Sequence, residues 1–214
     1  MSLQAKLDAY KADFMKRATA DALAVMREAT ESLAASGILD GVIGVGDALP
    51  EFELKNQDGQ AVRSEELLRE GPLVLSFFRG IWCPYCNIEL EALNAANPAI
   101  LDAGARLITI APQTENWAHK NRLDRNLDFD ILVDEGNRYA SQLGLVFSLP
   151  KALIEVYTNF GLELPTYNGD ESWTLPLPAR LVVDSSHRVA YASVNADYTI
   201  RPEPDEVIAA LVAL

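Results

Sequence analysis

The sequence has little of what marks a secreted or membrane protein. It contains two cysteines in 214 residues. No apolar stretch approaches the roughly 20 residues that cross a bilayer. The first residues show no positively charged segment followed by an apolar core, so no secretory signal is visible. We therefore expect a protein of the reducing cytoplasm, with no membrane as a partner.

Basic residues are also scarce. The chain has 18 Lys and Arg against 31 Asp and Glu, which gives a formal net charge of −13. Such a charge argues against nucleic acid or an anionic membrane as a partner, and we interpret it as a solubility feature. Hydrophobic residues at 49% and charged residues at 23% are ordinary for a globular protein. The length allows one domain with an extension, or at most two small domains.

Proline and glycine are absent from residues 3–35. Apolar positions recur there at helical spacing, at Leu3, Leu7, Tyr10, Phe14, Ala18 and Ala22. This predicts one long or two shorter helices that end at Gly37. They either pack on the rest of the chain or pair with a second copy as a homodimer. The glycine-rich stretch 41–46 follows no strand and lacks a P-loop lysine, so we interpret it as a linker between a helical extension, 1–40, and a domain at 44–214.

Both cysteines lie in one turn, Trp82-Cys83-Pro84-Tyr85-Cys86. The apolar run 73–78 before this turn predicts a buried strand, and residues 86–97 after it predict a helix that Pro98 ends. A helix N-terminus stabilises a thiolate, because its backbone N–H groups and dipole favour negative charge. Arg79, four residues before Cys83, is the candidate cation that lowers a thiol pKa further.

Other uses of the C-x-x-C spacing are less favoured. A zinc site usually needs four ligands, and His119 and His187 stand in unrelated contexts on a predicted helix surface and in a predicted turn. Covalent haem needs histidine after the second cysteine, where the chain has Asn87. A purely structural disulfide would close too small a loop to stabilise much. Two ordinary buried thiols remain an alternative. We expect no metal and no cofactor.

The remainder of the chain alternates between predicted strands and helices. Strands are predicted at 73–78, 106–110 and 129–133, helices at 115–120 and 138–143, a β-hairpin at 181–194 and a last helix opened by Pro204. Strand–helix alternation followed by a hairpin and a closing helix predicts an α/β sandwich with a mixed sheet.

These residues carry a family resemblance. Gly46-Asp47-x-x-Pro50-x-Phe52-x-Leu54, Gly59, the strand into Phe77-Phe78, the cysteine turn and Glu89 resemble the thioredoxin-fold superfamily, and within it the peroxiredoxin-like proteins related to alkyl hydroperoxide reductase. The resemblance implies a thioredoxin-like three-layer sandwich. It also implies a hydroperoxide substrate reduced through a cysteine sulfenic acid, with a cellular thiol such as thioredoxin or glutathione as reductant.

The chain also departs from the family pattern. Peroxiredoxins carry P-x-x-x-T/S-x-x-C before the reacting cysteine. If Cys86 is that cysteine, Arg79 replaces the proline and Cys83 replaces the Thr/Ser. Pro178 stands where peroxiredoxins carry an arginine and resembles the cis-proline of thioredoxins, so a cis Leu177–Pro178 bond is predicted. Arg180, two residues on, points to the same side if the strand extends that far.

Two alignments disagree on the attacking cysteine, and we favour Cys83 because access to the thiolate governs reactivity. A thioredoxin-like arrangement favours Cys83, because the first cysteine is the exposed one, whereas the peroxiredoxin alignment favours Cys86. Trp82 either shields the sulfurs or is an ordinary core aromatic. We expect Asp197 to pair with Arg201, although the segment 197–202 is also a candidate lining of the site.

The sequence therefore predicts a thiol-dependent hydroperoxide reductase that forms a Cys83–Cys86 disulfide, with Arg79, Trp82, Pro178 and Arg180 in supporting positions. One alternative is a thioredoxin-like protein thiol–disulfide oxidoreductase without significant peroxidase activity. Another is a non-catalytic binding protein with a relic site, since a fold does not fix a function.

Overall fold

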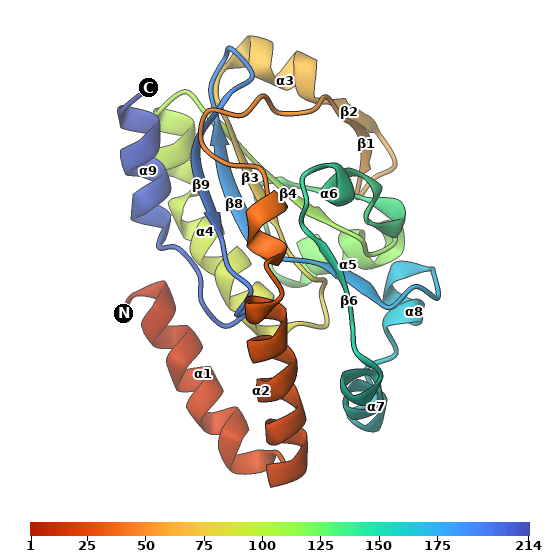
Figure 1. Cartoon of the computed structure of the whole chain (residues 1–214). Coiled ribbons are helices and arrows are strands. Elements are labelled where there is room, and N and C mark those ends of the chain that lie inside the picture. Colours follow the sequence, from red (N-terminus) through yellow and green to blue (C-terminus); the bar gives the residue numbers. More distant parts are fainter.

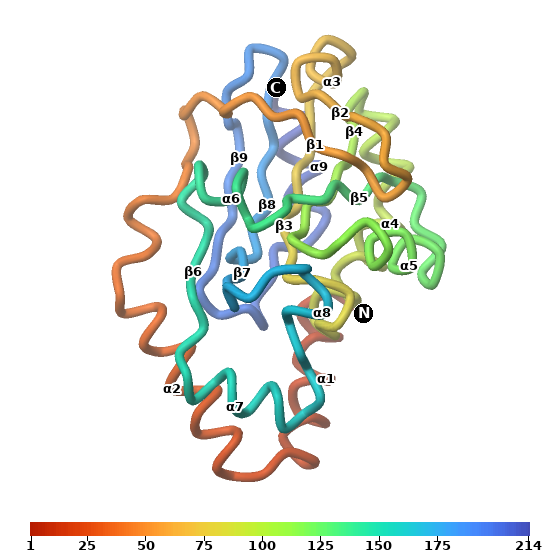
Figure 2. The backbone as a smooth tube through the Cα atoms, turned by 90° about the vertical axis from the view of Figure 1, so that its right-hand side faces the viewer, coloured from red at the N-terminus to blue at the C-terminus, as the bar shows by residue number.

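A seven-stranded mixed sheet forms the centre of the computed structural model, which describes residues 1–214 (Figures 1 and 2). The strand order is β2-β1-β5-β4-β3-β8-β9. β3, β4 and β5 are parallel, and the other neighbouring pairs are antiparallel. The strands are β1 (Glu53–Asn56), β2 (Ala61–Arg63), β3 (Leu73–Phe77), β4 (Arg106–Ala111), β5 (Asp130–Val133), β8 (Ala179–Val183) and β9 (Val189–Val194).

Helices cover both faces of the sheet, which makes three layers. Side chains alternate along a strand, so in β3 Val74 faces one core while Leu73 and Leu75 face the other. The Val74 core is closed by α1 (Leu3–Arg17), α4 (Pro84–Asp102), α5 (Glu115–Asp124) and α9 (Pro204–Val212). The opposite core is closed by α3 (Ser64–Glu70), α6 (Arg138–Gln142) and the segment 38–49, which begins with the 3-10 helix η1 (Ile38–Gly41). The predicted α/β three-layer sandwich is confirmed.

The first 35 residues form two helices, α1 and α2 (Ala20–Ala35). They separate at Thr19, whose hydroxyl accepts a hydrogen bond from the Ala22 amide as the N-cap of α2. Leu3 and Leu7 are fully buried in the core beside α4, so α1 packs on the rest of the chain. Figures 1 and 2 show α2 beside α7 (Lys151–Asn159) at the lower end of the molecule. The division at residues 40–44 stays a prediction.

Two sequence predictions about the backbone are wrong. α4 does not end at Pro98 but continues to Asp102. Proline removes one helical hydrogen bond, and here the buried Asn97 and Ile100 hold the helix against the core on either side of it. The Leu177–Pro178 bond is trans, as all peptide bonds here are. The backbone runs extended from β7 (Thr174–Pro176) into β8 and makes no tight turn of the kind a cis bond favours.

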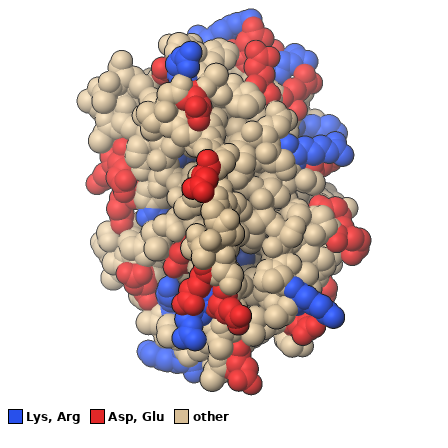
Figure 3. Space-filling model, viewed as in Figure 1, with Lys and Arg blue, Asp and Glu red and all other residues tan.

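The sequence predicted no helix or strand in residues 146–176 or at helix α3. They contain β6 (Val146–Ser148), α7, α8 (Leu164–Asn168) and β7, and β6 pairs with β7 in a separate two-stranded sheet. A cluster around Leu149, Leu153 and Tyr157 packs this part against α2. No helix of the structure combines the length and the apolar character of a membrane span. Acidic and basic side chains are interspersed on the face drawn in Figure 3.

Candidate active site

The turn between β3 and α4 is held in one conformation from several sides. Gly80 has φ +137°, and a Cβ on it would lie 2.6 Å from Nε1 of Trp82, so only glycine fits. The Ile81 amide donates to Oε1 of Gln113 at 2.7 Å, and the Ile81 carbonyl accepts from Nδ2 of Asn87 at 2.7 Å. The two cysteines therefore leave the sheet along a fixed path.

Cys83 is the N-cap of α4, Pro84 is its first residue, and Cys86 lies in the first turn. Proline is favoured at this first position, because its missing N–H would have no helical partner. Both sulfurs are free thiols, and the residues are 1% and 0% exposed. The expectation that Cys83 is the exposed cysteine is therefore wrong as a statement about surface area. The two differ instead in their neighbours.

Arg79 is the cation next to Cys83. Its Nη1 lies 4.0 Å from Cys83 Sγ, and its Nη2 donates to the hydroxyl of Tyr157. The guanidinium lies 4.2 Å from the ring centre of Tyr198, 4.9 Å from Trp82 and 5.9 Å from Tyr157. Aromatic faces attract a cation, so Arg79 stays charged although it is buried and has no carboxylate partner.

Arg201 is the cation next to Cys86. Its Nη2 lies 3.7 Å from Cys86 Sγ, and its Nε donates to Glu89 at 2.7 Å. Arg180 donates to the other oxygen of Glu89 at 2.5 Å and to the carbonyl of Pro202 at 3.0 Å. The three side chains are buried and form an ion triad with one carboxylate between two guanidinium groups. Arg180 contacts neither sulfur.

The expected pairing of Asp197 with Arg201 is wrong, whereas the alternative that the segment 197–202 lines the site is confirmed by Arg201 and Tyr198. Asp197 instead accepts from the hydroxyl of Thr199 at 2.7 Å and lies 3.9 Å from Lys11. The signal that was available is Glu89. A carboxylate on the apolar face of a helix needs a buried cation, and Arg180 and Arg201 were candidates for it.

The two thiols have different acidities. Burial alone would raise the pKa of Cys83, but the neighbouring Cys86 thiol and the charges of Arg79 and Arg201 lower it to about 6. Burial raises the pKa of Cys86, and a negative charge on Cys83 raises it further. Burial also raises the pKa of Tyr157 and Tyr198, so both phenols stay neutral beside Arg79. The pair therefore carries its first negative charge on Cys83.

Cys83 lines a pocket. This pocket, called the aromatic pocket below, has a volume of about 230 Å³, and 10 of its 13 lining residues are hydrophobic. The lining comes from α1 and α2, from the cysteine turn, from the region of α7, and from the segment after β9. Its members are Tyr10, Phe14, Arg17, Met26, Arg79, Trp82, Cys83, Pro84, Tyr85, Tyr157, Phe160, Leu162 and Tyr198.

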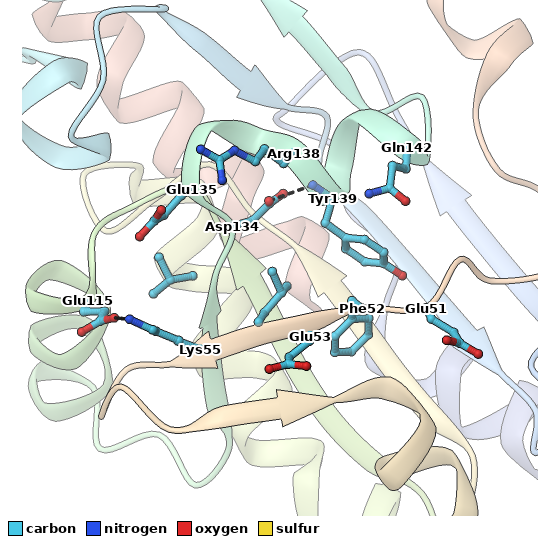
Figure 4. Close-up of a pocket in the computed structure, with 12 residues that line it drawn as sticks. Glu51, Phe52, Glu53, Lys55, Glu115, Asp134, Glu135, Arg138, Tyr139 and Gln142 are labelled. Atoms are coloured by element: carbon cyan, nitrogen blue, oxygen red, sulfur yellow. Dashed lines mark hydrogen bonds and ion pairs between the residues drawn. The ribbon is translucent and has the colours of Figure 1, made fainter.

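A second pocket, of about 390 Å³, is drawn in Figure 4 and contains neither cysteine. Three of its charged side chains are paired within the fold. The Asp134 carboxylate accepts from the amides of Tyr139 and Ala140 at 2.8 Å, at the start of α6, and Lys55 pairs with Glu115 at 3.4 Å. No three His, Cys, Asp or Glu side chains of the chain are arranged to hold a metal ion. We therefore place the chemistry at the cysteine turn.

The structure brings together four of the predicted site residues, Cys83, Cys86, Arg79 and Trp82. Arg180 is linked to them indirectly, because it shares the Glu89 carboxylate with Arg201. Trp82 is half-buried, packs edge-on against Tyr157 at 5.7 Å, and lines the aromatic pocket. Pro178 is buried between β7 and β8 and does not line this pocket. His119 lies on a helix surface beside Asp58, and His187 lies in a turn with φ +64°, both as expected.

Comparison with known proteins identifies relatives in sequence. The profile of the AhpC/TSA family matches residues 45–192. A chloroplastic peroxiredoxin Q of Triticum aestivum is 32% identical over 133 residues, which cover 60% of this chain and 59% of the relative. A thiol-disulfide oxidoreductase ResA of Bacillus thuringiensis is 24% identical over 102 residues, covering 47% and 58%. The chain thus spans less than two thirds of the length of these relatives.

Solved structures agree on the fold. Peroxidoxin BcpB from Mycobacterium tuberculosis superposes with a TM-score of 0.64 at 22% identity, over 80% of this chain and 98% of that one. A peroxiredoxin-like protein from Aquifex aeolicus gives a TM-score of 0.63 at 16% identity, over 80% and 88%. The predicted thioredoxin-like fold is confirmed.

Proposed function

Because this chain belongs to the AhpC/TSA family, we propose that it is a thiol-dependent peroxidase acting through Cys83 and Cys86. The observation that carries the proposal is the pairing of each buried sulfur with its own guanidinium, Arg79 at 4.0 Å from Cys83 and Arg201 at 3.7 Å from Cys86. A buried thiol without such a partner would stay protonated and inert.

The proposed reaction begins at Cys83. Its thiolate attacks the terminal oxygen of a hydroperoxide ROOH, the S–O bond forms as the O–O bond breaks, and the leaving RO⁻ takes a proton from water to become ROH. Cys83 becomes a sulfenic acid. The Cys86 sulfur attacks this sulfenic sulfur, and the hydroxide that leaves combines with the Cys86 proton as water. The product is the Cys83–Cys86 disulfide.

Two observations support Cys83 as the attacking residue. It lines the aromatic pocket, whereas Cys86 is fully buried beside Arg201 of the ion triad. Its pKa of about 6 makes it mostly thiolate at neutral pH. Cys86 keeps its proton until the sulfenic acid forms, and Arg201 then stabilises the charge that develops on its sulfur.

The disulfide must be reduced by two thiol groups to complete the cycle. We propose a cellular thiol such as thioredoxin or glutathione as this reductant, and a reducing compartment such as the cytoplasm as the setting. The absence of any other cysteine supports resolution within the same turn rather than by a distant thiol.

The test is stopped-flow tryptophan fluorescence of the reduced protein mixed with hydrogen peroxide, beside Cys83→Ser and Cys86→Ser. We expect a reaction orders of magnitude faster than that of free cysteine. Cys83→Ser should abolish it, whereas Cys86→Ser should keep the fast step and accumulate sulfenic acid, detected by mass spectrometry. A rate equal to that of free cysteine in the wild type contradicts the proposal for this peroxide.

A second candidate is thiol–disulfide exchange with a protein substrate. The similarity to ResA over 102 residues and the W-C-P-Y-C sequence favour it. An insulin-reduction assay with a thiol recycling system distinguishes the two. Insulin reduction without peroxide turnover would establish this second function in place of the first.

A further inference from the structure

The aromatic pocket has walls that the family match does not cover. Tyr10, Phe14, Arg17 and Met26 come from α1 and α2, which precede the matched residues 45–192. Of the two pockets described above, only the aromatic pocket is lined by Cys83. The helical extension therefore supplies part of the wall around this cysteine.

The two halves of α1 differ in how deeply their apolar side chains are buried. Leu3, Leu7, Tyr10 and Phe14 follow one stripe of the helix, since they are separated by three or four residues. Leu3 and Leu7 are buried in the core, but Tyr10 and Phe14 remain half-buried. The first half of the stripe thus anchors the helix, and the second half leaves apolar surface facing the pocket.

Aromatic contacts join this surface to the cysteine turn and to α7. Tyr10 packs edge-on against Tyr85 at 5.2 Å, and Phe14 packs edge-on against Phe160 at 6.0 Å. All four rings line the pocket, so these edge-on pairs, which are a favoured aromatic geometry, connect its walls. The two charged residues of the lining, Arg17 and Arg79, are both cationic, so no carboxylate opposes a peroxide at Cys83.

We propose that the helical extension makes the enzyme selective for hydroperoxides that carry a bulky apolar group, with Tyr10, Phe14 and Met26 as specificity-determining residues. This proposal rests on the proposed peroxidase function. The peroxide end lies toward Cys83 and Arg79, and the apolar group occupies the rest of the aromatic pocket. Hydrogen peroxide has no such group, so it gains nothing from this surface.

The test compares second-order rate constants for oxidation of the reduced full-length protein by cumene hydroperoxide and by hydrogen peroxide. We expect the wild type to prefer cumene hydroperoxide. Phe14→Ala should lower the ratio of the two rate constants by about tenfold, because the apolar wall is lost. Met26→Trp, which fills the pocket from α2, should lower the same ratio while all residues of α1 stay unchanged.

Met15→Ala is the matched control, since Met15 is on the same helix, is 54% exposed and does not line the pocket. Its ratio should equal that of the wild type. A ratio that stays constant in both Phe14→Ala and Met26→Trp overturns the proposal, as does an equal fall in Met15→Ala. If the wild type reacts fast with hydrogen peroxide and the ratio of the two rate constants is the same in every variant, only the selectivity is refuted. If neither peroxide outpaces free cysteine, the peroxidase function fails and the selectivity fails with it.

Discussion

The two cysteines lie three residues apart, yet their surroundings are opposite in kind. Beside Cys83, the positive charge of Arg79 is surrounded by aromatic rings, next to a pocket. Beside Cys86, the positive charge of Arg201 is paired with the carboxylate of Glu89 in the ion triad. The surroundings of Cys83 are thus aromatic and adjoin a pocket, and those of Cys86 are ionic.

This difference gives Arg79 and Arg201 different roles. Neutral aromatic rings do not neutralise the Arg79 charge, so its full attraction is available to the Cys83 thiolate. Glu89 partly neutralises Arg201, and that side therefore contributes more to holding the architecture than to acidifying a thiol. Four measurements test this difference between the two cysteines.

The largest expected effect is on stability, at the ionic side. Glu89→Ala leaves two buried guanidinium groups without their carboxylate, and breaking a buried ion pair costs about 3–5 kcal/mol. Urea unfolding followed by circular dichroism measures the change. The control is Glu65→Ala, which removes an exposed pair with Arg69 and should cost at most about 0.5 kcal/mol. Equal losses of unfolding free energy in both variants would mean that the buried triad stabilises the fold no more than an exposed ion pair does.

The next effect is on reactivity, at the aromatic side. Arg79→Met removes the cation closest to Cys83 and should raise its pKa above the value of about 6. A rise of about two units would leave roughly a tenth of the thiol ionised at pH 7, so alkylation by iodoacetamide should slow about tenfold. Arg106→Met, at an exposed pair with Glu70, is the control. An unchanged alkylation rate would show that Arg79 does not lower the pKa of Cys83.

The pH dependence sharpens the same point. The pKa of Cys83 is lowered, so its thiolate persists down to a pH of about 6 and is lost as the pH falls below that value. Alkylation of the reduced wild type should therefore be nearly flat from pH 9 to 7 and fall about tenfold from pH 7 to 5. A midpoint near pH 8.5, the value of an ordinary thiol, would show that the two arginines do not act on Cys83.

The smallest effect concerns Trp82. This ring contacts Arg79 and lines the aromatic pocket, and the other two tryptophans, Trp117 and Trp173, do not line it. Trp82→Phe keeps an aromatic face over Arg79, so the oxidation rate should change by no more than about threefold. The fluorescence change on oxidation should disappear from the stopped-flow trace, so the oxidation rate of this variant is measured by mass spectrometry of samples quenched at timed intervals. A retained signal would place the reporter at another tryptophan.

The sequence was informative where signals are local. Two cysteines in one turn, an apolar run before them and helix formers after them predicted the strand, the turn and the start of α4. The stripe from Leu3 to Phe14 predicted the helical extension. Pro98 misled, because packing of Asn97 and Ile100 outweighs one missing hydrogen bond. Residues 146–176 gave no clear period, since their short elements are held by a local cluster rather than by the main core.

The residues of the cysteine turn were enough to predict a thiol site at a helix N-terminus, because these residues are adjacent in the chain. The packed chain was needed to learn which cation lies beside which sulfur. Arg201 reaches Cys86 from 115 positions away, and Tyr198 and Tyr157 surround Arg79 from separate segments. It also decided that the first two helices form a wall of the aromatic pocket. Burial and distance between remote segments are properties of the packed chain, and no local pattern encodes them.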